Sequence, residues 1–234
     1  MLHNDIQYRT MKRIAIIPAR GGSKRLARKN ILPVSGQSML CYPIQTALET
    51  GLFDSVMVST EDEEIAEIAL NAGADVINRP KTLAQDRSTI VEVCLHAISQ
   101  IAIDEFCCIY ATSVLLKAAT ITAAYDKFKS NKSASSLMGV SEYKYSPVQA
   151  LTKNSTGNLK YMWPEFKGIQ SQFHPELVVS NGTFVWVNAE KFVQEKTFYG
   201  EHLQGFLVPE EETSDIDTAH DYFRLQEKIH KTSK

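Results

Sequence analysis

The 234-residue sequence has few cysteines, little net charge and no long apolar run. Its 25 basic and 27 acidic side chains give a formal net charge of −2, whereas proteins that bind nucleic acid or membrane surfaces are usually basic overall. The four cysteines lie in apolar stretches without CxxC spacing, which predicts reduced thiols. A membrane-spanning helix needs about 20 mostly apolar residues in succession, and the chain has no such segment. We therefore expect a cytoplasmic protein that binds neither nucleic acid nor membranes.

The composition predicts one large domain. With 44% hydrophobic residues the chain can bury a sizeable core. Residues 1–11 lack the apolar core of a signal peptide, and we expect a disordered tail there. No repeat or linker divides the rest, so residues 12–234 are expected to form a single domain.

Strand and helix patterns alternate along most of that domain. Short, continuously apolar runs such as "RIAIIP" (13–18) and "FCCIYAT" (106–112) are typical of strands buried on both faces. Helices are expected at about residues 38–50 and 118–130, and after caps at Thr60 (a capping box with Glu63), Ser88 and Thr218. Repeated β-α units with short links predict a doubly wound α/β fold with a mainly parallel sheet.

The alternation breaks between about residues 141 and 175. Turn residues and aromatics without a helical period predict a β-rich arm. Exposed Tyr161, Met162 and Trp163 would suit contact with a second subunit, and packing back on the parent domain is the alternative. Strand patterns resume in "ELVVSNGTFVWVN" (176–188) around an Asn-Gly turn or bulge.

A basic loop follows the first predicted strand, in "IIPARGGSKRLARKN" (16–30). Ligands of doubly wound sheets bind beyond the carboxyl ends of the strands, which is where this loop lies. Gly21 and Gly22 permit backbone angles closed to other residues, so their amides could point at a phosphate. The loop matches neither GxxxxGK[ST] nor GxGxxG, which disfavours a P-loop kinase and a dinucleotide-dependent dehydrogenase. Its five cations favour a triphosphate, and a solvated basic turn is the alternative.

Two further stretches carry candidate ligands. Asp215 and Asp217 alternate in a segment predicted to be extended, so both carboxylates could face one side and hold Mg²⁺ together with substrate phosphates. The alternative is an acidic loop before a helix that Thr218 caps. Arg79, Asp86 and Ser88 follow the third strand and could line the same crevice as the basic loop. No GxSxG or Cys-His signature supports a covalent nucleophile.

Three stretches together resemble the CMP-sialic acid synthetase family, cytidylyltransferases that activate neuraminic, legionaminic and pseudaminic acids. They are "PARGGSKRLARKN" (18–30), "VSTEDEEIAEIALNAGADV" (58–76) and "SDIDTAHD" (214–221). The resemblance extends from Arg13 to about Leu225, and its first motif is highly specific. It implies a Rossmann-like nucleotidyltransferase fold and, commonly, a homodimer built through an arm.

The resemblance also implies roles for individual residues. Arg20 and Lys29 would contact the triphosphate and, with Asp217, carry the catalytic roles, while Asp215 and Asp217 would bind Mg²⁺. Arg25 and Arg28 are expected to be solvated neighbours. The positions assigned to nucleotide or substrate are Ala19, Arg20, Gly21, Gly22, Lys24, Lys29, Asn30, Arg79, Ser88, Tyr110 and Thr112.

One departure from the family bears on the sugar. The sialic-acid branch usually reads Gln-Pro-Thr-Ser-Pro after the fourth strand, with the glutamine near the sugar, whereas this chain has "YATSV" (110–114). "CCIYAT" and "IQSQ" are similar to the pseudaminic branch, but "SNGTFVWV" (180–187) is more like the neuraminic and legionaminic branches. Sugar identity stays open at this point, with the pseudaminic type favoured.

The resulting hypothesis is a transfer of CMP from CTP to a nine-carbon keto sugar acid. The anomeric hydroxyl would attack the α-phosphorus in line while Arg20 and Lys29 neutralise the departing pyrophosphate. The alternatives are a nucleotidylyltransferase for another sugar acid, a polyanion- or RNA-binding module, and a nucleotide-binding regulator without activity.

Overall fold

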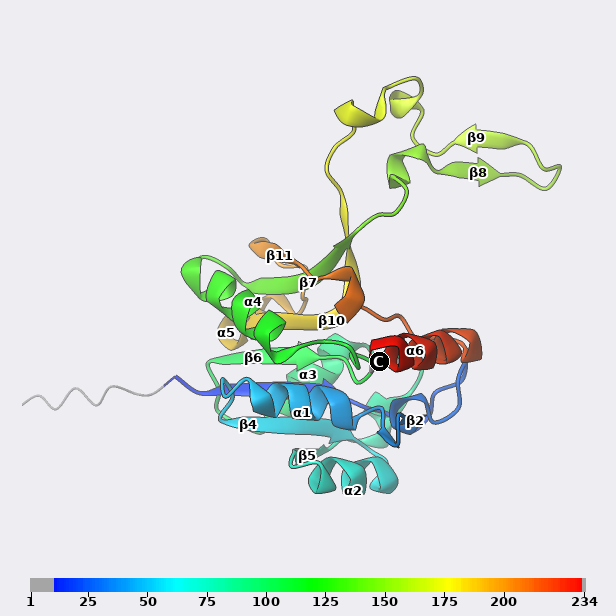
Figure 1. The fold of residues 1–234 in the computed structure, drawn as a ribbon. Coiled ribbons are helices and arrows are strands. Elements are labelled where there is room, and N and C mark those ends of the chain that lie inside the picture. The colour runs from blue at the N-terminus through cyan, green and yellow to red at the C-terminus, as the bar shows by residue number, and fades with distance from the viewer. Residues whose placement is uncertain (1–10, 233–234) are drawn as a thin grey trace, which may run out of the picture.

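The computed structural model describes residues 11–232, so the tail predicted at the N-terminus lies outside the described residues except for Met11. A seven-stranded sheet forms the body, with the strand order β11-β7-β10-β6-β1-β4-β5 (Figure 1). Its strands are β1 (Arg13–Pro18), β4 (Ser55–Thr60), β5 (Asp75–Asn78), β6 (Glu105–Ile109), β7 (Ser136–Glu142), β10 (Val178–Asn188) and β11 (Leu203–Leu207).

The sheet is mixed but mostly parallel. β1 pairs in parallel with both β4 and β6, and β4 pairs in parallel with β5. β10 alone reverses direction, because it returns antiparallel between β6 and β7. The predicted doubly wound, mainly parallel α/β fold is confirmed.

Helices cover both faces of this sheet, and alternate residues of β1 show how. Ala15 and Ile17 join a core with residues of α1, α2 and α4, whereas Ile14 and Ile16 join a core with residues of α3 and α5. All four are fully buried, as expected for a central strand with apolar side chains on both faces. The helices are α1 (Cys41–Glu49), α2 (Glu63–Asn71), α3 (Ile90–Ile98), α4 (Ala118–Ser130), α5 (Ala189–Glu195) and α6 (Ala219–Thr232).

Three of the predicted helix starts are displaced. Thr60 ends β4, so Asp62 caps α2 instead by accepting a hydrogen bond from the Ile65 amide at 3.1 Å. Thr89, not Ser88, caps α3 and forms a capping box with Glu92. α1 begins at Cys41 because the preceding residues form a short hairpin of β2 (Pro33–Val34) and β3 (Gln37–Ser38). α5 and β11 were not foreseen, while the predicted cap at Thr218 is present, with Thr218 Oγ1 accepting from the Asp221 amide at 3.3 Å.

The segment between β7 and β10 leaves the body as a projecting arm that carries the hairpin of β8 (Leu151–Lys153) and β9 (Leu159–Tyr161) (Figure 1). Its large apolar side chains lie mostly in solvent; Tyr145 is 79% and Phe173 72% exposed. The Asn-Gly pair of β10 lies where the pairing with β7 shifts register, with Gly182 at φ +64°, so it forms a bulge at the base of the arm.

The described residues include all four cysteines. All four cysteines are free thiols, and Cys94, Cys107 and Cys108 are buried. Within residues 11–232 no helix combines the length and apolarity needed to cross a bilayer.

Candidate active site

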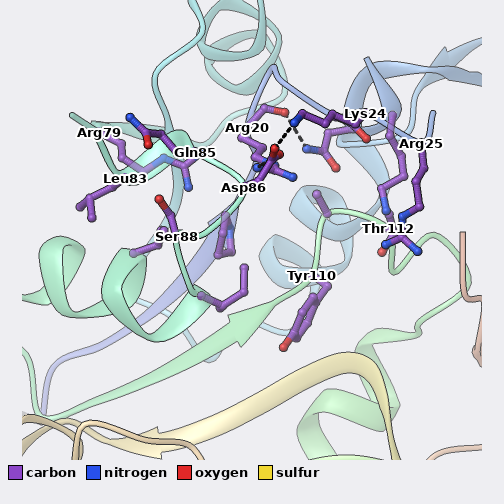
Figure 2. A pocket seen from close by; sticks show the side chains of 17 residues that line it. Arg20, Lys24, Arg25, Arg79, Leu83, Gln85, Asp86, Ser88, Tyr110 and Thr112 are labelled. Carbon is purple, nitrogen blue, oxygen red and sulfur yellow. Dashed lines mark hydrogen bonds and ion pairs between the residues drawn. The ribbon is translucent and has the colours of Figure 1, made fainter. Parts of the chain in front are cut away.

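A pocket of about 470 Å³ opens at the carboxyl ends of β1, β5 and β6, where Pro18, Arg79 and Tyr110 form parts of its wall (Figure 2). It draws together side chains from three loops that are distant in the sequence. The predicted site residues that line it are Arg20, Lys24, Lys29, Asn30, Arg79, Ser88, Tyr110 and Thr112, with Asp86 beside them.

The two aspartates near the C-terminus reach different surroundings. Asp217 contacts two cations that line the pocket, with Oδ1 3.2 Å from Lys29 Nζ and Oδ2 2.7 Å from Arg25 Nη1. Asp215 instead lines a second pocket of about 520 Å³ with Glu210 and Asp221. Ile216, which is buried, separates the two aspartates. The two carboxylates therefore have different neighbours in this structure, and the expectation that they bind one Mg²⁺ together stays a prediction.

Gly21 of the basic loop has a different role from the one expected, while the expectation for the Gly22 amide stays a prediction. Neither Gly21 nor Gly22 has a positive φ. The Gly21 amide donates to Glu61 Oε1 at 2.9 Å, so in this structure it is not free for a phosphate. A Cβ on Gly21 would overlap the Asp62 carboxylate, whereas Gly22 has no atom within 4 Å of that position. Glycine is needed at position 21 for close approach, not for its backbone freedom.

Arg28 is not a solvated neighbour of the loop, contrary to expectation. Its guanidinium donates to both oxygens of Asp62 and to Glu64 at the start of α2. The same Asp62 caps α2, so one side chain joins the basic loop to that helix. The Arg28 guanidinium, with smaller help from the helix amides, lowers the pKa of Asp62 below its ordinary value.

A second carboxylate holds the other side of the loop. Asp86 lies between Arg20, whose Nη1 is 3.2 Å from Asp86 Oδ1, and Lys24, with which it forms an ion pair (Figure 2). Lys24 and then Arg20 lower the pKa of Asp86. The Lys24 and Asp86 side chains are 79% and 43% exposed, so water can replace either partner at little cost.

Arg79 has a buried partner that was not predicted. Its Nη2 donates to Glu61 Oε2 at 2.7 Å, and the side chains of Arg79 and Glu61 are only 3% and 13% exposed. Glu61 directly follows β4, so its place at the carboxyl edge of the sheet was readable from the sequence. Its contact with Arg79, which follows β5, depends on the strand order, and the sequence did not predict that order.

The remaining lining residues shape the pocket. Asn30 is buried and donates to the Arg20 carbonyl at 3.0 Å, which holds the start of the loop. Tyr110 lies apart from the Arg20–Asp86–Lys24 group (Figure 2). Burial raises the pKa of the Tyr110 phenol, so it is a neutral hydrogen-bond donor at pH 7. Ala19 is fully buried and its amide donates to the Ser59 carbonyl at 3.0 Å, which makes it part of the strand framework.

Chemically, the pocket is a set of cations that carboxylates of the same chain already neutralise. Arg20, Lys24, Lys29 and Arg79 line it, and each forms an ion pair with an acidic side chain. An anionic ligand with several charged oxygens would compete for the exposed members of these pairs. The site thus suits a polyphosphate.

We predict that Gly21→Ala destabilises the protein by about 1 kcal/mol, because the added methyl group pushes Asp62 off the α2 amide or off Arg28. Gly22→Ala is the matched control, since its Cβ meets open space, and it should change the free energy of unfolding by less than about 0.5 kcal/mol. Urea unfolding of the two variants measures the difference. Equal stability would contradict the packing described for Gly21.

We predict that Asp62→Asn lowers stability at pH 7 by up to about 1 kcal/mol, because asparagine keeps the α2 cap but loses the charge facing Arg28. Since the folded protein lowers the pKa of Asp62, this contribution is present above the ordinary aspartate pKa and is lost as pH falls through the folded-state pKa. Unfolding of both proteins between pH 7 and pH 2.5 should show the two stabilities converging on acidification. A difference that stays constant or grows would refute the charge pairing.

Known structures share this fold. The chain superimposes on a CMP:2-keto-3-deoxy-manno-octonic acid synthetase solved with CTP, with a TM-score of 0.71 and 14% identity over 94% of this chain and 99% of that one. It also superimposes on a 4-diphosphocytidyl-2C-methyl-D-erythritol synthase of Anaerococcus prevotii, with a TM-score of 0.65 and 9% identity over 94% of this chain and 99% of that one. At these identities the likeness concerns the fold.

Sequence comparisons reach further than the fold. The chain is 37% identical over 219 residues to the pseudaminic acid cytidylyltransferase of Campylobacter jejuni, covering 90% of this chain and 93% of that protein. It is 32% identical to the N-acylneuraminate cytidylyltransferase of Streptococcus agalactiae, over 92% of this chain and 52% of that protein. The family model described as cytidylyltransferase matches residues 14–164. The resemblance seen in the sequence motifs is thereby confirmed: the chain belongs to the cytidylyltransferase family of nucleotidyltransferases.

Proposed function

We propose that this enzyme transfers CMP from CTP to the anomeric hydroxyl of a nonulosonic acid and releases pyrophosphate. The observation that carries the proposal is the convergence of Arg20, Lys24, Lys29 and Arg79 on one pocket at the carboxyl edge of a nucleotidyltransferase sheet. Pseudaminic acid is our choice of sugar, because the Campylobacter jejuni relative is named for it and Tyr110 stands where the sialic-acid branch has glutamine.

The proposed chemistry relies on charge and position. The sugar hydroxyl attacks the α-phosphorus, the bond to the β-phosphate oxygen breaks, and negative charge collects on the pyrophosphate. Arg20, Lys24 and Lys29 would stabilise that charge, since two unit charges about 4 Å apart interact by about 4 kcal/mol at an effective dielectric of 20. Phosphoryl transfer needs little else from the protein, in line with a pocket that offers cations and no evident nucleophile.

The ion pairs of this structure suggest how triphosphate binding begins. Asp86 would release Arg20 and Lys24 and move into water, because the carboxylate is already 43% exposed. Asp217 would likewise share or yield Lys29 and Arg25. Glu61 is too buried to leave Arg79 in the same way.

Magnesium is part of the proposal. Asp217 offers hard carboxylate oxygens beside Arg25 and Lys29 of the pocket, with its side chain 30% exposed, and these suit Mg²⁺. Among the described residues no group of three or more His, Cys, Asp or Glu side chains could hold a metal. Mg²⁺ ordinarily takes one or two carboxylates and fills its coordination with phosphates and water. We therefore propose Asp217 as one ligand and Asp215, two residues earlier, as the second. When bound, the ion would offset charge on the phosphate oxygens.

A homodimer in the cytoplasm completes the proposal. The arm carries Leu159, Met162 and Phe173, each more than half exposed to solvent. Exposed apolar side chains on a projecting arm are typical of surfaces that a partner covers.

The test is pyrophosphate release with CTP and, in separate reactions, pseudaminic, legionaminic and neuraminic acids. We predict turnover with CTP and highest kcat/KM for pseudaminic acid. Arg20→Ala should lower kcat/KM by about 10²–10³, by analogy with the loss of one donor to a developing oxyanion. Arg87→Ala, a change to an exposed arginine in the loop that carries Asp86, is the control and should retain activity. No turnover with any of the three acids, or normal turnover by Arg20→Ala, would sink the proposal.

A further inference from the structure

Glu61 occupies a bridging position in the site. It follows β4, which lies between β1 and β5 in the sheet. The basic loop extends from β1 and Arg79 follows β5, so Glu61 stands between them. Its Oε1 accepts from the Gly21 amide at 2.9 Å and its Oε2 accepts from Arg79 Nη2 at 2.7 Å. One carboxylate thereby joins the two halves of the pocket wall.

Arg79 is the member of this bridge that lines the pocket. It lines the pocket although it is only 4% exposed, and its backbone amide is tied to the Thr60 carbonyl at 2.9 Å. Glu61 uses one of the five guanidinium N–H groups, and Nε is buried without a hydrogen-bond partner among the described residues. The hydrogen bond from Nη2 to Glu61 is therefore what the structure offers to fix the direction of this buried guanidinium.

Burial separates this ion pair from the others in the pocket. The partners of Asp86 and Asp217 include Lys24 and Arg25, whose side chains are 79% and 71% exposed. Such pairs exchange readily with an incoming anion. The Arg79–Glu61 pair is shielded from water, and removing either member would leave the other buried and unpaired. Glu61 is therefore placed to stay while the other pairs exchange.

We infer that Glu61 is a positioning residue for the nucleotide: it fixes the direction of the Arg79 guanidinium and the register of the Gly21 loop without touching the nucleotide itself. This inference rests on the proposed function, in which CTP is the ligand of the pocket. The Gly21 amide serves as an anchor for the loop, and the loop presents its cations from that anchor. Replacing a residue with a purely structural role would lower stability and would weaken nucleotide and sugar binding to the same extent. Replacing a positioning residue for the nucleotide would weaken nucleotide binding more than sugar binding.

The test measures CTP affinity by calorimetry and steady-state kinetics on Glu61→Gln. Glutamine has the same shape but one acceptor oxygen, so it can serve Gly21 or Arg79 but not both. We expect the Kd and KM for CTP to rise at least about tenfold, with the KM for the sugar acid within about twofold of wild type. Glu61→Asp keeps the charge and both oxygens and should weaken CTP binding less. Glu63→Gln removes the same charge from an exposed residue of α2 and should leave CTP binding unchanged.

A double variant tests whether Glu61 acts through Arg79. If it does, Glu61→Gln combined with Arg79→Ala should bind CTP about as weakly as Arg79→Ala alone. Losses that multiply would overturn the claim that Glu61 acts through Arg79. Wild-type CTP affinity in Glu61→Gln, or a greater loss in Glu61→Asp than in Glu61→Gln, would overturn the whole inference. A wild-type protein without affinity for CTP would overturn the proposed function as well, which distinguishes the two failures.

Discussion

The contact between the carboxylates at the end of β4 and the basic loop after β1 underlies the rest of the site. Glu61 holds the Gly21 amide and Arg79, and Asp62 holds Arg28 while it caps α2. A loop with five cations would otherwise repel itself and extend into solvent. Because two successive acidic residues bind it at both ends, the loop has a defined shape before any ligand arrives. Its other cations, Arg20, Lys24, Arg25 and Lys29, line one pocket.

That anchoring divides the charges of the site into two groups. Buried or helix-linked pairs, such as Arg79–Glu61, set the geometry. Exposed pairs, such as Lys24–Asp86, neutralise the pocket while it is empty and can give way to phosphate. A buried ion pair is costly to break because each partner would be left charged and away from water, so the buried pairs keep the site in place. An exposed ion pair is weak because water solvates both partners, so it can exchange with a phosphate. One pocket can thus be both preorganised and able to accept a highly charged ligand.

Much of this could be predicted from local pattern, and the remainder depends on sheet order. Continuous apolar runs identified central strands such as β1 and β6, and the position of the loop after β1 placed its cations at the carboxyl edge of the sheet. The acidic partners of the cations in the pocket could not be predicted, since Arg79 contacts Glu61 only because β4 lies between β1 and β5. The need for glycine at position 21 could not be predicted either, because it comes from the close approach of Asp62, which the order of residues in the sequence does not show. Asp215 and Asp217 show the same limit: alternation in an extended segment does not determine which side chains each carboxylate contacts.

The most direct test of this account is a crystal structure of the protein with bound CTP. It should show Glu61 still bridging the Gly21 amide and Arg79, with Arg20 and Lys24 turned from Asp86 to the phosphates. A complex in which Glu61 has released Arg79, or in which Asp86 keeps both of its cations while CTP is bound, would contradict the division between fixed and exchangeable pairs.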